Sequence, residues 1–461
     1  MDELVLASYL ERSKDRILAS LVEWLKVPSV SADPDHATDV RTSAEMCAGF
    51  LHEAGFRRVE LLETGGHPAV YAEWLGAGES APTVLVYGHT DVQPVDPLEE
   101  WDSPPFEPLI SGDVLSGRGA SDDKGQVLMQ IEAARGLLSE RGELPVNLKI
   151  LFEGEEEVGS PHFEALLEAN RERFAGDVVV VSDTTMEAPD IPTTTVGMRG
   201  LVAFDVVVRT APADLHSGIW GGTVPNAALV AAQMAAALHD ERRRVTIPGF
   251  YDDVRELSPE EAASLNAIPF DEGEFRRTAG VAYLEGEEDR TPRERTGTRP
   301  TAELVGIHSG YGGPGMKTIV PATANFKVAM RIVADQAPDK IAEAFRRWAQ
   351  DQAPEGVEVT LTKFGGVAPM VTPADSPAMR CLSRAMQKVW GKEPLLERSG
   401  GSGPEEALGR VLGVPVISLG IALPGDHFHA PNETLSLAQL WRGLLAAGEL
   451  LIELGTLKIP Q

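Results

Sequence analysis

The sequence predicts an α/β protein whose mostly parallel sheet is covered by helices and interrupted by an inserted α+β domain. In the first ~190 residues, continuous apolar runs alternate with helical patterns, which is typical of a parallel sheet buried on both faces. Near Gly197 the strand pattern changes to alternating apolar and polar positions, and from Asp375 the first pattern returns. We therefore expect a first domain formed by residues 1–195 and 373–461, with residues 196–372 inserted as a lid or dimerisation domain.

Each element of the first part follows from its local pattern. The opening residues alternate charged and apolar positions, which favours an amphipathic helix. Short β-branched runs predict strands, and longer mixed segments predict helices. The expected elements are a strand at 83–89, a helix at 124–141, a strand at 146–153, a helix at about 162–173 and a strand at 177–183.

The inserted part and the final part follow in the same way. The insertion should contain strands at 201–209, 324–333 and 357–364, an Ala-rich helix at 224–240 and a helix at about 338–351. Between them we expect a charged, irregular stretch that extends to about residue 300. The final part should contain a helix from 375 to about 390, a strand at 415–420 and a terminal amphipathic helix.

The composition excludes several classes of protein. A formal charge of −29 opposes binding to a nucleic acid backbone. No apolar run approaches the ~20 residues that a membrane span needs, and the opening residues do not resemble a signal peptide. The two cysteines, Cys47 and Cys381, are too few for a disulfide framework. We therefore expect a cytoplasmic protein.

Acidic and imidazole side chains follow the predicted strands at their carboxyl ends. These residues are His89 and Asp91, Asp122 and Asp123, the run Glu155–Glu157, Asp183, and His429. Ligands of open α/β sheets bind outside the carboxyl ends of the strands, so we expect these groups to converge. Carboxylates gathered there would repel one another unless a cation neutralised them. Imidazole with carboxylate suits zinc, and manganese and cobalt are also suitable.

The motifs in this pattern resemble those of the co-catalytic zinc peptidases, a family that includes carnosinase-type dipeptidases, aminoacylase and carboxypeptidase G. The matching segments are GHTDVQP, WDSPPFEP, GRGASDDKG, EGEEEVGS, DLHSG and HAPNE, in family order and over nearly the whole chain. The residues VQP and DDKG favour the dipeptidase branch. The resemblance implies a homodimer that hydrolyses an amide bond in dipeptides or small peptides.

The same resemblance implies two divalent metal ions per subunit, most simply zinc. His89, Asp122 and Asp183 would hold one ion, while Asp122, Glu157 and His429 would hold the other, so that Asp122 bridges them. A shared carboxylate suits two-metal sites, whose ions lie about 3.5–4 Å apart.

Two supporting features accompany this ligand set in the family. Asp91 would hydrogen-bond the far ring nitrogen of His89 and fix its tautomer. A cis peptide would follow the bridging aspartate, between Asp122 and Asp123.

The resemblance also assigns the acid–base chemistry. Glu156 would take a proton from a metal-bridging water and later deliver it to the leaving amine. The family pattern EGxEE settles the register of the three glutamates. It leaves Glu155 at the variable position, where we expect a solvated side chain.

The inserted domain would contribute substrate contacts. His216 matches a histidine that stabilises the oxyanion in the active site of the partner subunit. Asn226, Arg331 and Ser402 resemble residues that bind the substrate, with the arginine suited to its carboxylate. Carnosinase-type members continue the serine loop with a β-branched residue and proline, whereas this chain has Gly403-Pro404, which puts the shape of the pocket in doubt.

The main alternative is a deacylase of N-acyl amino acids, which would use the same metals and the same carboxylate contacts. A non-catalytic relative would be expected to lack Glu156 or a ligand, and this chain has them all. A nucleotide site at GRGAS is disfavoured, because the spacing G-x-G-x-x-G is absent and acidic neighbours would repel phosphate.

Overall fold

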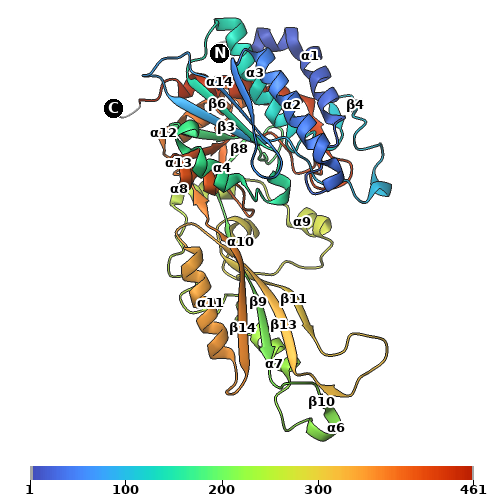
Figure 1. The fold of residues 1–461 in the computed structure, drawn as a ribbon. Helices are drawn as coiled ribbons and strands as arrows, with labels where there is room; N and C mark the ends of the chain where they lie inside the picture. Colours follow the sequence, from blue (N-terminus) through green and yellow to red (C-terminus); the bar gives the residue numbers. More distant parts are fainter. Residues whose placement is uncertain (1–3, 459–461) are drawn as a thin grey trace. The chain divides into compact units, whose positions relative to one another are not determined.

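Residues 4–458 are described by a computed structural model of the chain, in which the residues form two compact units (Figure 1). Within these residues, unit 1 comprises 4–196, Thr372–Glu397 and 403–458, and unit 2 comprises Gly197–Val371 and Arg398–Ser402. The short segment Arg398–Ser402 therefore packs with the inserted unit, although the sequence pattern assigns 373–461 as a whole to the first domain. No helix within residues 4–458 has both the length and the apolar character needed to cross a membrane.

A six-stranded, mostly parallel sheet organises unit 1, as the sequence predicts. Its order is β1-β2-β6-β3-β7-β17, in which β6, β3, β7 and β17 pair in parallel and β2 is antiparallel to both of its neighbours, β1 and β6. The strands are β1 (Arg58–Leu62), β2 (Ala69–Trp74), β3 (Thr83–His89), β6 (Asn147–Glu153), β7 (Val178–Val181) and β17 (Val416–Ser418). The predicted strands at 83–89, 146–153, 177–183 and 415–420 are thus confirmed.

Helices cover both faces of this sheet. Val84 and Val86 of β3 face one large core that includes α1, α2, α3, α12 and α14, whereas Tyr87 of the same strand packs against Phe163 of α4. Alternate residues of the strand therefore enter different cores, which explains its continuous apolar sequence. The helices are α1 (Ala7–Leu25), α2 (Ala37–Ala54), α3 (Lys124–Arg141), α4 (Phe163–Ala169), α5 (Arg171–Phe174), α12 (Pro377–Trp390), α13 (Glu405–Leu412) and α14 (Leu437–Leu454).

Short elements complete unit 1. The predicted helix at 162–173 is in fact two helices, α4 and α5, with Asn170 between them. Three short strands form a separate sheet: β4 (Leu109–Ser111), β5 (Val114–Ser116) and β18 (Thr434–Ser436). The 3₁₀ helices are η1 (Pro34–His36), η2 (Leu98–Glu100) and η3 (Glu156–Val158).

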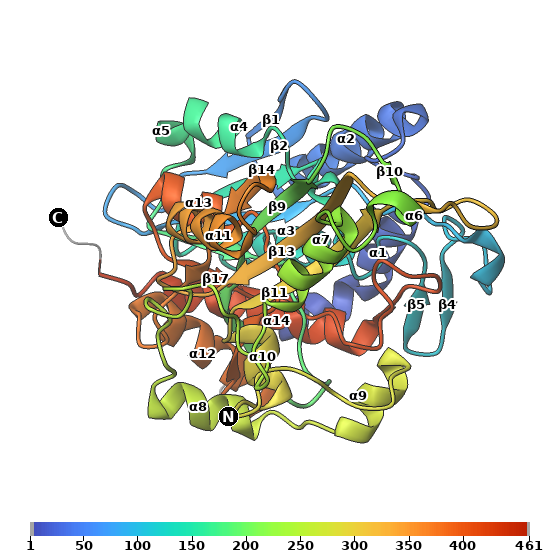
Figure 2. The ribbon, with the colours of Figure 1, turned by 90° about the horizontal axis from the view of Figure 1, so that it is seen from below.

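Unit 2 contains a four-stranded antiparallel sheet in the order β11-β13-β9-β14. Burial alternates along β9 (Gly200–Arg209), because one face of the sheet packs under helices and the other does not. Helices α7 (Ala227–Ala236) and α11 (Pro338–Gln352) cover that one face (Figure 2). The other strands of the sheet are β11 (Thr301–Ser309), β13 (Thr323–Ile332) and β14 (Glu358–Val367).

The charged stretch before residue 300 is more ordered than predicted. It contains α8 (Pro259–Ala267), α9 (Glu272–Ala279) and α10 (Pro292–Gly297), and side-chain N-caps begin all three. Ser258 and Thr291 each form a capping box with the glutamate three residues later. The remaining elements are α6 (Ser217–Trp220), β8 (Thr193–Met198), β10 (Leu215–His216), β12 (Ile319–Val320), β15 (Met370–Val371) and β16 (Leu395–Ser399).

Candidate metal centre

The acidic and imidazole residues of unit 1 converge at the carboxyl edge of its parallel strands. His89 is the last residue of β3, and Asp183 lies just after the neighbouring strand β7. Asp122 precedes α3, and Glu157 lies in η3 after β6. The sheet topology therefore brings together residues that are distant in sequence, as the general rule for open α/β sheets predicts.

Asp122 lies between two histidines. Its Oδ1 is 3.0 Å from Nε2 of His89, and its Oδ2 is 2.9 Å from Nε2 of His429. His89 Nε2 is also 3.6 Å from Asp183 Oδ2, and His429 Nε2 is 3.2 Å from Glu157 Oε2. The five predicted ligands thus form two groups that share one carboxylate.

These separations fit a metal ion in each group. Ligand atoms around tetrahedral zinc lie about 3.3–3.5 Å apart, because Zn–N and Zn–O bonds are about 2.0–2.2 Å long. The ring of His89 is fully buried, and the Glu157 side chain is only 2% exposed. Imidazole and carboxylate are suitable donors for such an ion. The residues present therefore fit a pair of divalent cations.

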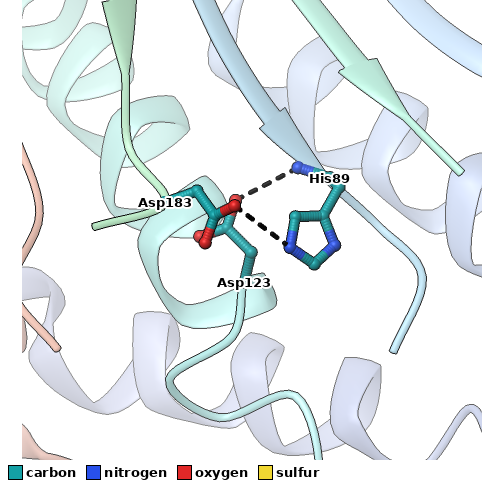
Figure 3. Close-up of side chains that lie close together, drawn as sticks. All are labelled: His89, Asp123 and Asp183. Carbon is teal, nitrogen blue, oxygen red and sulfur yellow. Dashed lines mark hydrogen bonds and ion pairs between the residues drawn. The ribbon is translucent and has the colours of Figure 1, made fainter. Parts of the chain in front are cut away.

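Asp123 also belongs to this cluster. Figure 3 shows its carboxylate beside that of Asp183, with both facing His89, and its Oδ2 accepts the backbone N–H of His89 at 3.1 Å. A Cβ on Gly88 would lie 2.6 Å from this oxygen, so glycine allows the close approach. The peptide between Asp122 and Asp123 is cis, which confirms that expectation.

The carboxyl groups of the cluster raise one another's pKa values. Burial, followed by repulsion from Glu157 and Asp122, raises the pKa of Glu156 to about 7, although His89 opposes the shift. Burial and neighbouring carboxylates likewise raise the pKa of Asp183. Carboxyl groups behave in this way when too many share a site without a cation.

The histidines respond in the opposite sense. Hydrogen bonds to Asp122 and Glu157 raise the pKa of His429 to about 10. Burial works against a proton on His89, but Asp183 and the other carboxylates nevertheless raise its pKa. The neighbouring carboxylates thus favour a positive charge on both imidazoles, and a bound cation would supply that charge in place of the protons.

Asp91 is near its predicted partner, with one difference in detail. The Nδ1 atom of His89 lies 3.1 Å from the backbone carbonyl of Asp91 and 3.4 Å from its carboxylate Oδ1. The carboxylate Oδ2 instead accepts the backbone N–H of Glu157 at 3.1 Å. Asp91 thus orients one candidate ligand of each group, and the prediction missed its contact with Glu157.

The expectation for Glu155 is wrong. Its side chain is buried and bonds Nδ1 of His162 at 2.8 Å, because the chain folds over it at Gly66. The triplet of glutamates is therefore not a solvated turn. Glu155 packs inward, while its two neighbours lie with the cluster.

Two further residues position the site, and sequence reasoning missed them. Glu433 is fully buried and accepts the backbone N–H groups of Gly119, Ser121 and Asp122 at 2.9–3.1 Å, and its Oε2 binds Arg118. Gln93 donates to Glu157 Oε2 at 2.7 Å. Both lie inside quoted motifs, HAPNE and GHTDVQP, but only the structure shows what they contact.

The predicted substrate-binding residues of unit 2 form two separate groups. Arg331 donates to the hydroxyl of Ser402 at 2.9 Å, and this hydroxyl donates to the carbonyl of Arg199 at 2.5 Å. His216 pairs with Ile319, and Asn226 caps α7, whose first N–H binds the carbonyl of Pro321.

These two groups lie at opposite ends of β13. About nine residues of extended chain separate Ala322, just before the strand, from Arg331 near its end. At about 3.3 Å per residue this amounts to roughly 30 Å. Within one copy of unit 2, His216 and Asn226 are therefore far from Arg331 and Ser402.

A parallel α/β sheet that gathers imidazole and carboxylate groups at its carboxyl edge is suited to a metal-dependent hydrolase. A scan against protein families matches residues 85–453 to the peptidase family M20/M25/M40, and the chain belongs to this family. The predicted recognition and the prediction of a metallopeptidase-type enzyme are thereby confirmed.

Relatives and solved structures agree with this membership. The chain is 30% identical to the cysteinylglycine-S-conjugate dipeptidase of Corynebacterium striatum, with 96% of each chain covered. It is 28% identical to the human Beta-Ala-His dipeptidase, over 93% of this chain and 88% of the relative. An M20-family metallo-carboxypeptidase from Sulfolobus solfataricus superposes with a TM-score of 0.81 at 33% identity, covering 96% of this chain and 99% of that one.

Proposed function

We propose that this peptidase hydrolyses the amide bond of dipeptides or small peptides at a dinuclear site formed by His89, Asp122, Glu157, Asp183 and His429. The observation that carries the proposal is the position of Asp122, with one carboxylate oxygen toward each histidine. Two zinc ions, or manganese or cobalt, would supply Lewis acidity there, lowering the pKa of water and polarising the scissile carbonyl.

Glu156 is the proposed general base and acid. Glu156 is partly buried near His89, Asp122 and Glu157 and belongs to neither ligand group, so its carboxylate can accept a proton from water and return it. It would take a proton from the attacking water and deliver it to the leaving amine. Its neighbours Glu157 and Asp91 hold the segment in place through the backbone N–H of Glu157.

Arg331 and Ser402 are the proposed contacts for the substrate carboxylate. A guanidinium group binds a carboxylate through two parallel N–H donors, and the hydroxyl of Ser402 already orients Arg331. Dipeptidases, carboxypeptidases and deacylases of N-acyl amino acids all need such a contact. This group therefore does not distinguish among the three activities.

We also propose that unit 2 mediates dimerisation and that the active site is completed by His216 of the partner subunit. An extended dipeptide spans only about 7 Å, so His216 and Arg331 of one copy cannot both contact it across roughly 30 Å. Support for an interface comes from β11, an edge strand of its sheet with exposed Leu304, Val305 and Ile307.

A mixing experiment tests this arrangement. Inactive His216→Ala subunits would be combined with inactive Glu156→Gln subunits under conditions in which subunits exchange. Heterodimers should recover part of the wild-type activity, because one of their two sites would contain both groups. No recovery despite demonstrated exchange would contradict the cross-subunit role.

We keep the cytoplasm as the proposed location. Cys47 and Cys381 are both buried and free, as expected in a reducing compartment. Fractionation of cells that express the full chain would test it.

Hydrolysis of a substrate panel tests the main proposal. Metal-free protein would be reconstituted with zinc or manganese and given free dipeptides, longer peptides and N-acyl amino acids. Metal-dependent release of amino acids from dipeptides is the expected result. Activity on N-acyl amino acids alone would move the function to deacylation, and preference for longer peptides would favour a carboxypeptidase, as the Sulfolobus solfataricus structure suggests.

A further inference from the structure

A pocket of about 620 Å³ opens on unit 2 beside Arg331. It is lined by side chains from the segments 239–251, 285–287 and 295–304, by Arg199 just before β9, and by Arg331 near the end of β13. Its carboxylates are Glu285, Glu287 and Glu303. Five guanidinium groups enter its lining: Arg199, Arg243, Arg295, Arg299 and Arg331.

Two of these arginines are already neutralised. Arg299 forms two hydrogen bonds with the carboxylate of Glu287, at 2.8 Å each, and Arg243 forms an ion pair with Glu285. These pairs account for two of the three carboxylates of the pocket.

The other three arginines bind only neutral oxygens. Arg199 donates to the carbonyls of Gly400, Arg295 and Arg299 at 3.1–3.4 Å. Arg295 Nε donates to the carbonyl of Glu287 at 2.9 Å, and Arg331 donates to Ser402. Over the described residues 4–458, none of the three forms an ion pair with a carboxylate.

Free donors remain on these three side chains. A guanidinium has five N–H groups, and the bonds above use at most two nitrogens of each arginine. None of their nitrogens is among the buried side-chain atoms without a partner. The remaining N–H groups are therefore accessible to a ligand in the pocket.

Charge repulsion makes an anion favourable there. Burial, and after it the nearby charge of Arg331, lower the pKa of Arg199 to about 10, with only Glu303 opposing. Three unpaired guanidinium groups and one unpaired carboxylate leave two positive charges on the pocket. A ligand with two carboxylates carries the matching charge.

We propose that this pocket selects substrates whose C-terminal residue is aspartate or glutamate. The main-chain carboxylate would bind Arg331 and Ser402, and the side-chain carboxylate would bind Arg295 and the free N–H groups of Arg199. The second contact makes Arg295 a specificity-determining residue. This inference rests on the proposed function, because it takes Arg331 as the site of the main-chain carboxylate.

Paired substrates test the proposal. Ala-Glu and Ala-Gln have nearly the same shape and differ by one negative charge, so their ratio of kcat/KM isolates the side-chain carboxylate. We expect wild-type protein to prefer Ala-Glu by about 10-fold, as a charge-assisted hydrogen bond allows. In Arg295→Met the ratio should fall toward one, and Arg295→Lys should recover part of it.

Arg347→Met is the control. It removes one positive charge from the exposed surface of α11, and Arg347 does not line the pocket, so the ratio should keep its wild-type value. Equal kcat/KM for the two peptides in wild-type protein would overturn the proposal. A wild-type ratio that survives in Arg295→Met would overturn the role of Arg295.

Two further measurements separate this proposal from the proposed function. If dipeptides are not cleaved, N-acetyl-glutamate and N-acetyl-glutamine give the same comparison for deacylation. If neither class is cleaved, calorimetric titration of L-glutamate and L-glutamine into the metal-loaded protein tests the pocket directly. Tighter glutamate binding that Arg295→Met abolishes would support it. Equal binding, or displacement of glutamate by an equal concentration of inorganic phosphate, would contradict a carboxylate-selective site.

Discussion

The carboxyl edge of the unit 1 sheet and the pocket of unit 2 are both clusters of like charge, but of opposite sign. In unit 1, carboxylates surround two histidines with ligand atoms 2.9–3.6 Å apart. In unit 2, three guanidinium groups bond only to carbonyl and hydroxyl oxygens. Each cluster favours a counter-ion that the protein chain itself does not supply.

The difference lies in how the ligand atoms are held. The acidic edge is fixed by hydrogen bonds that Glu433 and Asp91 accept from backbone N–H groups and that Gln93 donates to Glu157, which suits a small cation with strict geometry. The arginines line an open pocket and keep free donors, which suits a larger anion that enters and leaves. We therefore assign catalysis to the acidic edge of unit 1 and substrate selection to the arginine pocket of unit 2.

The largest effect is expected from removal of the shared carboxylate. Asp122→Ala should lower the metal content below two ions per subunit and reduce kcat by about 10³-fold or more, because both ligand groups lose a member. Metal analysis and peptide hydrolysis would check this result. Asp102→Ala, at an exposed aspartate, is the control, and two bound ions in Asp122→Ala would contradict the bridge.

The next effect separates chemistry from metal binding. Glu156→Gln should reduce kcat by about 10²–10⁴-fold while two ions stay bound, because the amide cannot accept a proton from water. Glu155→Gln is the matched control, because Glu155 is the adjacent glutamate, is buried against His162 and belongs to neither ligand group. Wild-type turnover in Glu156→Gln would exclude Glu156 as the base.

A smaller effect should come from substitution of Glu433, which accepts hydrogen bonds from the loop that carries Asp122. Glu433→Gln places an amide where three backbone N–H groups need an acceptor, so the loop that carries Asp122 should shift. We expect metal affinity to fall by about 10–100-fold, as for other residues that orient ligands. Competition with a chelator would measure it, and unchanged affinity would show that Glu433 only stabilises the fold.

Glu405 differs from the carboxyl groups of the metal centre, because burial alone raises its pKa. Burial raises the pKa of Glu405 to about 7, and its Oε2 has no hydrogen-bond partner. The native state thus binds a proton that the unfolded state loses at about pH 4.5, so stability falls as the pH rises from about 4.5 to 7.

Glu405→Gln should remove this loss of stability at higher pH. We expect it to raise the free energy of unfolding by about 1–3 kcal/mol at pH 8 and to change it little at pH 5. Thermal melting at both pH values would measure the difference. Glu406→Gln, which removes a surface ion pair with Arg410, should not stabilise the protein at pH 8. An equal effect of Glu405→Gln at both pH values would contradict the raised pKa.

Elements with strong local signals were predictable from the sequence. The helix at Lys124–Arg141 has its predicted bounds, since Gly142 takes a left-handed conformation that ends it. Strand β3 was equally clear, because a short β-branched run precedes GHTD. The convergence of the metal-site residues followed from a general rule about the edges of parallel sheets.

The features that were missed depend on contacts between distant segments. Glu155 is buried because Gly66 and His162 close over it, which no local pattern indicates. The segment Arg398–Ser402 packs with unit 2 because Arg199 binds the carbonyl of Gly400. The arginine pocket was missed for the same reason, since only the fold shows which arginines have carboxylate partners.

A zinc titration of metal-free protein, with peptide hydrolysis and bound metal measured at each step, tests the dinuclear site most directly. We expect activity to rise until two ions per subunit are bound and then to stay constant. We also expect binding to release protons, because the carboxyl groups with raised pKa values must ionise. Full activity with one ion per subunit, or activity that persists without metal, would contradict the dinuclear site.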